Sequence, residues 1–403
     1  MKPSAQAAAT GRAARPARPA CPVCAGEGSA FMSLAAMPVL IGRQFETPEA
    51  ARASARGPVR LAFCPHCSFI WNEAFDPALL VYDTAYDNSL HYSDVFQEYT
   101  RRLVERLVES YGIRDKTVVD IGCGKGDFLG MLCEAGGNRG VGFDPSYEGE
   151  LDPAGRPVTF VRDMFSQKYG CVGGDLVCSR YVLEHVPEPA RFVSMIRAAI
   201  GGRRDAVVYA EVPNVEFILR GLSVWDIIYE HCSYFSAASL ARIFCDRGFR
   251  IARLAEGYAG QFLCIDALAG GNEEGRPLRR HELAAIASQV RAFGAEFERR
   301  VGGWRERLAQ WGAEGRRVVA WGAGAKAVGF LNMVGAGDEI GGVVDINPNK
   351  RGHYLAGTGH RILAPDELAQ DRPATVIVMN PVYRDEIRDR LHAMNLNPEL
   401  MEA

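Results

Sequence analysis

Apolar and polar positions follow two alternating periods over residues 116–270. Short apolar runs, typical of buried strands, are separated by segments whose apolar residues recur every three or four positions, as on one face of a helix. The strand-like runs are Thr117–Ile121, Gly140–Phe143, Val158–Val161, Asp175–Ser179, Ala206–Val212 and Phe262–Ala267, and helical patterns cover 126–135, 188–201 and 236–247. This alternation predicts a parallel, doubly wound α/β sheet, with the last run, after Gly260, as an antiparallel strand at its edge.

A second α/β pattern follows a long helical segment. Apolar residues recur at steps of three and four over residues 278–312, which predicts one long helix. A coiled coil is the alternative, but the glycines at 294, 302 and 303 favour a helix packed between domains. Strand-like runs at Arg317–Trp321, Gly342–Asp345 and Thr375–Met379 then predict a second Rossmann-like unit.

The stretch between the first cysteines and the first strand is rich in aromatic residues. Residues 94–110 carry Phe96, Tyr99, Leu103 and Leu107 at helical spacing, which predicts a connecting helix. The polar cluster around Tyr86 and Asn88 is the part of this stretch that we expect to line a substrate site.

Composition and charge exclude several classes of protein. The 403 residues are 48% hydrophobic and 24% charged, and no apolar run reaches the length of a membrane span. The formal net charge is −3, and without the four basic residues of the first twenty it is −7 for residues 21–403. An acidic body disfavours nucleic acid as the partner. We expect a protein with neither membrane nor nucleic-acid partners, located in the cytoplasm because seven of its eleven cysteines are scattered singly.

The other four cysteines form two Cys-x-x-Cys knuckles, Cys21/Cys24 and Cys64/Cys67, each with proline after the first cysteine. Each knuckle brings two thiolates together, and two knuckles complete the S4 set of a structural Zn²⁺. A redox pair is the alternative, but no thioredoxin-like strand and helix flank either knuckle. Because four thiolates leave no open coordination position, we expect zinc to take no part in the chemistry.

A glycine-rich turn follows the first strand of the α/β sheet. The strand ends in Asp120, and Gly122, Gly124 and Gly126 lead into the next helix. The spacing is G-x-G-x-G rather than the dinucleotide fingerprint G-x-G-x-x-G. An acid here suits an ammonium group better than a pyrophosphate, so the pattern indicates S-adenosyl-L-methionine as the cofactor.

Acids at the next two strand ends support this cofactor. Asp144 follows the second strand, where a carboxylate can accept from both ribose hydroxyls. Asp163 and Met164 follow the third strand, where an acid can meet the adenine amino group and an apolar side chain its face. Three acids at successive strand ends are a far more specific signal than the glycine turn alone.

Polar residues at the fourth and fifth strand ends face the expected methyl donor. The candidate catalytic residues are His185, Tyr229, Glu230 and His231, and Asn214 is a candidate substrate-binding residue. In the C-terminal unit, a second glycine turn follows a strand and can hold a phosphate through backbone amides and a lysine. Its candidate substrate-binding residues are Gly322, Gly324, Lys326 and Asp345. A structural duplicate that binds nothing is the alternative for this unit.

These features divide the chain into five predicted parts. They are a disordered tail (1–20), a zinc-binding domain (21–80), a helical connector (81–115), an S-adenosylmethionine-binding methyltransferase domain (116–270) and a C-terminal Rossmann-like domain (278–403). The fold class is therefore α/β, a class I methyltransferase domain flanked by a small zinc-binding domain and a second Rossmann-like domain.

This combination resembles the three-domain sugar C-methyltransferases of deoxysugar and cell-surface polysaccharide biosynthesis. The resemblance rests on the domain order and on two motifs of that family, Tyr-x-Glu-His and His-x-Pro. His185-Val186-Pro187 matches the second motif and Glu230-His231 the end of the first, while Ile228 occupies the tyrosine position and Tyr229 follows it. The resemblance implies methylation of the carbon beside the ketone of a nucleotide-linked 4-keto-deoxysugar, with the C-terminal domain holding the nucleotide.

The implied mechanism is proton removal followed by attack of an enolate on the sulfonium methyl group. We expect His231 to be the base, Glu230 to orient it, and His185 or Tyr229 to stabilise the enolate oxygen. Two alternatives among enzymes are an O- or N-methyltransferase acting on a sugar or other small metabolite and a zinc-ribbon RNA methyltransferase, which the acidic body disfavours. A non-catalytic protein that binds S-adenosylmethionine and a nucleotide is the alternative of another class.

Overall fold

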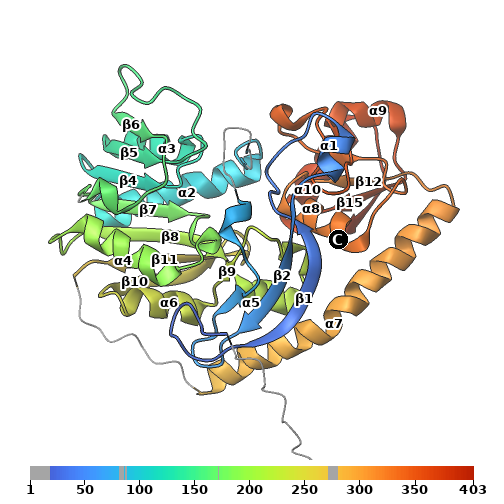
Figure 1. Cartoon of the computed structure of the whole chain (residues 1–403). Helices are drawn as coiled ribbons and strands as arrows, with labels where there is room; N and C mark the ends of the chain where they lie inside the picture. Colours follow the sequence, from blue (N-terminus) through green and yellow to red (C-terminus); the bar gives the residue numbers. More distant parts are fainter. Residues whose placement is uncertain (1–18, 81–85, 87–88, 171, 271–279) are drawn as a thin grey trace, which may run out of the picture.

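The computed structural model describes residues 19–80, 86, 89–170, 172–270 and 280–403, and it forms three β-sheets with flanking helices (Figure 1). The seven-stranded sheet formed by the middle of the chain and the five-stranded sheet near the C-terminus lie at opposite sides of Figure 1, and strands of the four-stranded sheet near the N-terminus lie between them. In the described part of the chain, no helix is long and apolar enough to cross a membrane.

The central sheet has the strand order β10-β11-β8-β7-β4-β5-β6. Its parallel strands are β4 (Thr117–Ile121), β5 (Arg139–Phe143), β6 (Val158–Val161), β7 (Leu176–Arg180) and β8 (Val207–Pro213). The predicted apolar runs thus become the strands of a parallel sheet, within one or two residues at each end. The predicted doubly wound α/β fold is confirmed.

The prediction of the edge strand was wrong. β11 (Phe262–Leu268) pairs antiparallel with β8 as expected, but β10 (Arg250–Gly257) pairs with its other side and forms the edge. β10 alternates charged and apolar residues and is only partly buried, so it shows no apolar run. Charged residues of this kind are typical of sheet edges.

Helices cover both faces of the central sheet. The apolar faces of α2 (Asp94–Tyr111) and α3 (Asp127–Gly136) share one hydrophobic core with the sheet. Those of α4 (Pro189–Ile200) and α6 (Ala237–Cys245) share another core on the opposite face. This arrangement leaves the carboxyl ends of the parallel strands accessible, which is where doubly wound sheets bind ligands.

The N-terminal sheet contains a strand from much later in the chain. Its order is β1 (Ser29–Pro38), β2 (Arg56–Phe63), β3 (Ile70–Asn72) and β9 (Ser233–Tyr234), with the short helix α1 (Pro48–Arg52) between β1 and β2. Ile70 pairs with Tyr234 and Trp71 with Ser233. The chain directly after the predicted catalytic residues 229–231 is therefore held by the N-terminal sheet.

The C-terminal sheet is parallel throughout, and the second Rossmann-like unit is confirmed. Its order is β14 (Ile362–Leu363), β13 (Val343–Val344), β12 (Val318–Trp321), β15 (Thr375–Val378) and β16 (Glu399–Glu402), and its helices are α8 (Ala325–Val334), α9 (Leu368–Asp371) and α10 (Arg384–Ala393).

The predicted long helix is α7 (Arg280–Ala313), which runs along one side of the molecule to the C-terminal unit (Figure 1). Its apolar residues, among them Phe293 and Trp304, are buried in a core shared with β1, α5 (Val215–Gly221) and α8. The helix therefore packs between the parts of one chain, as predicted. Single-turn helices complete the structure: η1 (Pro77–Leu79), η2 (Gln167–Tyr169), η3 (Leu183–His185), η4 (Val224–Asp226), η5 (Pro348–Lys350), η6 (Pro365–Glu367) and η7 (Pro381–Tyr383).

Candidate active site

A cavity of about 790 Å³ lies at the carboxyl ends of the central strands and extends to the C-terminal unit. Its lining comes from the connector, from the turns after β4, β5, β6 and β7, and from the start of α8. The volume suits a ligand the size of a cofactor together with its substrate. Most of the predicted site residues meet in this one cavity.

Asp120 ends β4 inside the cavity and is 2% exposed. Burial raises the pKa of its carboxyl to about 7; nearby Asp144 raises it further and Arg180 opposes the shift. A carboxyl held here at the edge of ionisation gains from a cationic partner, which would stabilise its charged form. An ammonium group is such a partner.

The glycines after Asp120 are required by the backbone and by close neighbours. Gly122, Gly124 and Gly126 all adopt positive φ angles. A Cβ at Gly122 would lie 2.2 Å from the Val182 side chain, and one at Gly126 would lie 2.7 Å from the Phe160 ring. Gly122 and Gly124 line the cavity with backbone alone, whereas Gly126 lies outside its lining and makes room for the Phe160 ring.

Asp144 lines the cavity and also holds this turn in place through hydrogen bonds. Its Oδ2 accepts a hydrogen bond from the Gly124 amide at 2.9 Å, and its Oδ1 accepts from the Ser146 amide and hydroxyl at 2.8 and 2.6 Å. The carboxylate is thus fixed at the end of β5, where the ribose of the cofactor is expected.

Asp163 and Met164 lie at the rim of the same part of the cavity. Asp163 accepts hydrogen bonds from the Met164 amide at 2.8 Å and the Tyr169 hydroxyl at 2.5 Å, and it pairs with Lys168. The Lys168 and Tyr169 contacts hold the pKa of Asp163 down at about 2. Met164 is 57% exposed, so an apolar side chain is left uncovered at the position predicted for the adenine face.

The sequence reasoning missed a buried ion pair at the centre of the site. Arg180, which ends β7 and lines the cavity, donates from Nε to Glu211 on β8 at 2.7 Å. Glu211 also accepts hydrogen bonds from the hydroxyls of Tyr99, Tyr181 and Tyr209 at 2.7, 2.8 and 3.0 Å. These residues come from three separate elements, so no local pattern could reveal the network. It fixes Arg180, whose guanidinium lies 4.4 Å from the Phe128 ring centre.

Two predicted catalytic histidines meet in the cavity. The rings of His185 and His231 are 5.0 Å apart, nearly perpendicular, and both line the cavity. Burial lowers the pKa of His185 to about 4 and that of His231 well below its usual value. Both imidazoles are therefore neutral at pH 7. His185 Nδ1 donates to the Glu230 carbonyl oxygen at 3.2 Å, so its Nε2 carries the lone pair.

Glu230 is fully buried behind these rings. Its carboxylate accepts hydrogen bonds from the Ile41 amide and, at 2.9 Å, from the Tyr86 hydroxyl, and it lies 3.9 Å from His185 Nδ1. Tyr86 lines the cavity, as predicted for a substrate-binding residue. Glu230 thus connects the predicted connector site to the histidine pair.

Tyr229, predicted as a catalytic residue, does not reach the cavity. Its side chain is fully buried, does not line the cavity, and packs against Phe75 and Gly57. Its hydroxyl accepts from the Asp76 amide at 2.9 Å and donates to the Asp76 carbonyl at 3.2 Å. Tyr229 therefore attaches this segment to the N-terminal domain through the backbone of Asp76.

Asn214, predicted as a substrate-binding residue, also lies outside the cavity lining. It is 1% exposed, does not line the cavity, and caps α5 by accepting from the Glu216 amide at 3.0 Å. Its amide nitrogen donates to the Gly260 carbonyl at 3.0 Å. The other candidate of this kind, Asn88, lies outside the described residues.

The C-terminal candidates Gly322, Gly324, Lys326 and Asp345 all line the cavity. Lys326 pairs with Asp226 of η4, and Asp345 accepts from the Ala323 amide at 2.8 Å. Lys350, which the sequence reasoning did not single out, lies 3.6 Å from Asp345 and also faces the cavity. The second glycine turn thus opens onto the same cavity as the first.

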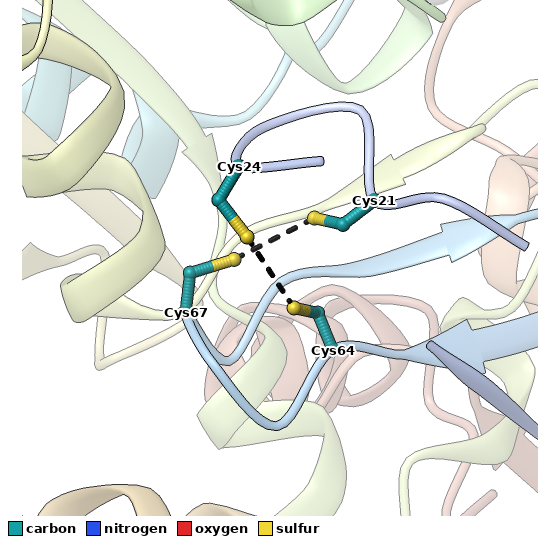
Figure 2. Close-up of side chains that lie close together, drawn as sticks. All are labelled: Cys21, Cys24, Cys64 and Cys67. Carbon is teal, nitrogen blue, oxygen red and sulfur yellow. Dashed lines mark hydrogen bonds between the residues drawn. The ribbon is translucent and has the colours of Figure 1, made fainter. Parts of the chain in front are cut away.

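The four predicted metal-ligating cysteines converge from two loops (Figure 2), and none of them lines the cavity. The Sγ atoms of Cys21 and Cys67 are 3.6 Å apart, and those of Cys24 and Cys64 are 3.5 Å apart. A tetrahedral Zn–S4 site with bonds of about 2.3 Å has sulfur separations of about 3.8 Å. The thiols are not joined as disulfides, so their arrangement fits a zinc ion.

Comparison with known proteins identifies two domains. A family described as "Methyltransferase domain" matches residues 93–254, and one described as "C-methyltransferase C-terminal domain" matches residues 275–397. The chain is similar to the C-methyltransferase NovU of Streptomyces niveus, with 28% identity over 312 residues that cover 72% of this chain and 73% of NovU.

Solved structures of low similarity include two methyltransferases. A Burkholderia thailandensis 1,6-didemethyltoxoflavin-N1-methyltransferase with bound S-adenosylhomocysteine is 19% identical, with a TM-score of 0.34, over 44% of this chain and 82% of that one. The magnesium protoporphyrin IX methyltransferase of Synechocystis PCC 6803 is 20% identical, with a TM-score of 0.35, over 43% and 83%. The two family matches and the similarity to NovU show that this chain is an S-adenosylmethionine-dependent methyltransferase whose C-terminal part resembles the C-terminal domain of C-methyltransferases.

Proposed function

We propose that this enzyme methylates the carbon beside the ketone of a nucleotide-linked 4-keto-deoxysugar. The observation that carries the proposal is the shared cavity: two half-buried, neutral histidines line the same cavity as the acids of the cofactor half, and this cavity continues to the glycine turn of the C-terminal unit. Carbon beside a ketone is acidic enough for a histidine to deprotonate, whereas an unactivated sugar carbon is not. The similarity to a C-methyltransferase supports the choice of carbon as the acceptor.

In this proposal the cofactor half holds S-adenosylmethionine. Asp120 accepts from the ammonium group, Asp144 from the ribose hydroxyls, and Asp163 from the adenine amino group, while Met164 covers the adenine face. The backbone at Gly122 and Gly124 lies against the ligand without a side chain between, and Gly126 lets the turn pack against Phe160. The cofactor supplies an electrophilic methyl group on its sulfonium.

His231 acts as the base. Its imidazole is neutral and lines the cavity, so the ring can accept a proton from a substrate bound there. His185 is oriented by the Glu230 carbonyl, and Glu230 in turn fixes Tyr86. General-base catalysis of this kind contributes about 10²–10⁴-fold. The remaining acceleration comes from holding the substrate carbon about 3–3.5 Å from the methyl group.

The C-terminal unit holds the nucleotide. Backbone amides at the start of α8 can bind a diphosphate, since a helix N-terminus favours anions. Lys326, Lys350 and Arg390 face the same space, and Arg390 Nε has no hydrogen-bond partner in the described part of the chain. Asp345 holds the turn that presents Gly322 and Gly324.

A structural Zn²⁺ bound by Cys21, Cys24, Cys64 and Cys67 completes the proposal. Four thiolates fill a tetrahedral shell, so the ion supplies stability to the N-terminal loops and no chemistry.

A thermal-shift experiment on the full-length protein tests the proposed substrate class. S-adenosylhomocysteine is added first, and then thymidine, uridine, guanosine or cytidine diphosphate. A ligand at a hundredfold excess over its dissociation constant stabilises the folded state by about 2.7 kcal/mol. A further shift with one nucleotide supports the nucleotide-sugar substrate and identifies its carrier. A shift with S-adenosylhomocysteine alone contradicts it and points to a substrate without a nucleotide.

A further inference from the structure

The histidine pair has a buried acidic neighbour that the mechanism above does not use. Glu184, in η3 between β7 and α4, is 1% exposed and lines the cavity. One of its carboxyl oxygens and one ring nitrogen each of His185 and His231 lie within 4.8 Å of one another. Glu184 Oε2 is buried without a hydrogen-bond partner in the described part of the chain.

The enolate oxygen of the proposed reaction still needs a hydrogen-bond donor. Tyr229 does not reach the cavity, because its hydroxyl is bound to the backbone of Asp76. His185 presents a lone pair at Nε2, because its Nδ1 proton is donated to the Glu230 carbonyl. Neither group predicted for this role can therefore donate a proton there.

The surroundings of Glu184 favour its neutral form. Burial raises the pKa of its carboxyl to about 8, and the charge of Glu211 on β8 raises it further, while its own backbone amide opposes the shift. The other titratable groups that face it are the neutral His185 and His231. Glu230 contacts the Nδ1 nitrogen of His185. The Cys232 thiol donates to the Glu184 carbonyl oxygen at 3.6 Å. No cation among the described residues forms an ion pair with Glu184. A buried acid without a cationic partner stays protonated.

We propose that Glu184 is a catalytic residue of this site, a neutral carboxylic acid whose O–H donates a hydrogen bond to the substrate carbonyl oxygen as it becomes an enolate. This inference rests on the proposed function. His231 takes the proton from the carbon beside the ketone, and the electron pair of that C–H bond forms the enolate, whose oxygen is bound by the Glu184 O–H. The enolate carbon then bonds to the methyl group, the S–CH₃ electron pair stays on sulfur, and the C=O bond re-forms. Glu184 keeps its proton, and His231 releases the abstracted proton to water.

The test compares wild type with Glu184→Gln, which keeps a donor but cannot ionise, and Glu184→Met, which has a similar shape but no donor. Glu188→Gln, on the exposed residue just before α4, is the matched control. The substrates are 4-keto-6-deoxyhexoses carried on the four nucleoside diphosphates, and methyl transfer is followed against pH. Binding of S-adenosylhomocysteine and thermal unfolding of each variant report on its folding.

We expect Glu184→Met to lower kcat by about 10²–10³-fold, as loss of one oxyanion donor does, with S-adenosylhomocysteine binding unchanged. The wild-type rate should fall above about pH 8, where the acid ionises, and this decline should be absent in Glu184→Gln. The infrared difference spectrum of wild type minus Glu184→Gln at pH 7 should contain the C=O band of a protonated carboxylic acid. This last measurement needs no substrate and remains informative if Glu184→Met does not fold.

Three results would overturn the inference while leaving the proposed function intact. They are a carboxylate rather than an acid band at pH 7, a kcat of Glu184→Met close to that of wild type, and binding of Co²⁺ beyond the four-cysteine cluster that Glu184→Gln abolishes. The last result would make Glu184, His185 and His231 a metal site. Failure of wild type to methylate any of the four substrates would instead overturn the proposed function and this inference with it.

Discussion

His231 is the base of the proposed reaction, and its environment predicts a large loss of activity when it is replaced. Burial keeps its imidazole neutral, and no second histidine can replace it at the same position, because the neighbouring ring of His185 is held by Glu230. We expect His231→Gln to lower kcat by about 10²–10⁴-fold without changing the affinity for S-adenosylhomocysteine. Steady-state kinetics and titration of the ligand measure the two quantities. His392→Gln, on the exposed side of α10, is the control, and equal activities of the two variants would contradict the assignment.

Asp120 predicts how cofactor binding depends on pH. Its carboxyl has a pKa of about 7 in the free protein because it is buried. An ammonium group binds the ionised form, so below pH 7 binding must first release a proton. The affinity for S-adenosylhomocysteine should therefore fall by up to about tenfold for each pH unit below 7 and level off above it. Calorimetric titration between pH 5.5 and 8 measures this. Asp120→Asn should bind at least about tenfold more weakly and lose the pH dependence; if it keeps that dependence, another group is responsible.

Single residues also show which features of the site the sequence could predict and which it could not. Acids at strand ends were predictable, because the carboxyl ends of parallel strands meet at one edge of a sheet. The orientation of residues 229–231 was not predictable. Tyr229 faces Gly57 and Phe75, Glu230 faces Ile41 and Tyr86, and His231 faces the cavity. Those partners lie more than a hundred residues away, so adjacency to a motif says nothing about which side chain enters the site.

At the scale of elements, a glycine in the turn between β4 and α3 can be compared with one after α2. The comparison separates the cost of a left-handed backbone from the cost of a steric clash. Gly126 adopts a φ of +87°, and a Cβ there would lie 2.7 Å from the Phe160 ring. Gly112, after α2, adopts a φ of +60° with nothing within 4 Å of an added Cβ. Gly112→Ala should therefore cost only the left-handed backbone strain, about 1–2 kcal/mol. Gly126→Ala should cost more and also weaken binding of S-adenosylhomocysteine.

Chemical denaturation and ligand titration of the two variants check this prediction. An identical loss of stability in both, with cofactor affinity retained in Gly126→Ala, would show that the turn does not approach the ligand closely.

The elements that the sequence predicted are those with a strong local pattern. The buried strands β4 to β8 and the long helix α7 have continuous or periodic apolar residues. β10 was missed because its charged residues interrupt the pattern, and the two-residue β9 has no pattern at all. Both depend on pairing with distant strands, which stabilises short or polar segments that have little preference of their own.

At the scale of the whole molecule, the cavity exists only because several parts of the chain enclose it. Lys326 pairs with Asp226, the amides of Gln261 and Asn380 exchange hydrogen bonds at 2.9 and 3.0 Å, and Ser93 donates to Glu386 at 2.8 Å. These contacts join the central and C-terminal units across the cavity. The sequence predicted both units, but their relative placement depends on contacts between single polar side chains, which follow no periodic pattern.

The N-terminal domain is hydrogen-bonded directly to the segment that carries His231, although its four cysteines do not line the cavity. β3 pairs with β9, and the Asn72 amide donates to the carbonyl of Cys232, the residue after His231, at 3.0 Å. The Cys64/Cys67 loop lies between β2 and β3. A zinc ion that orders this loop would therefore also hold the segment that carries His231 in place.

Loss of zinc should consequently lower methyl transfer although the ion does no chemistry. Cys64→Ser should remove one zinc per chain, lower the Tm, and reduce kcat by up to about 10²-fold, because displacement of a catalytic group by about 1 Å has an effect of that size. Metal analysis, thermal unfolding and kinetics measure the three changes, and Cys245→Ser on α6 is the control. S-adenosylhomocysteine affinity should change little, since the cofactor half is built on β4 to β6. A variant that loses its zinc and stability but methylates at the wild-type rate would show that the β3–β9 connection does not position His231.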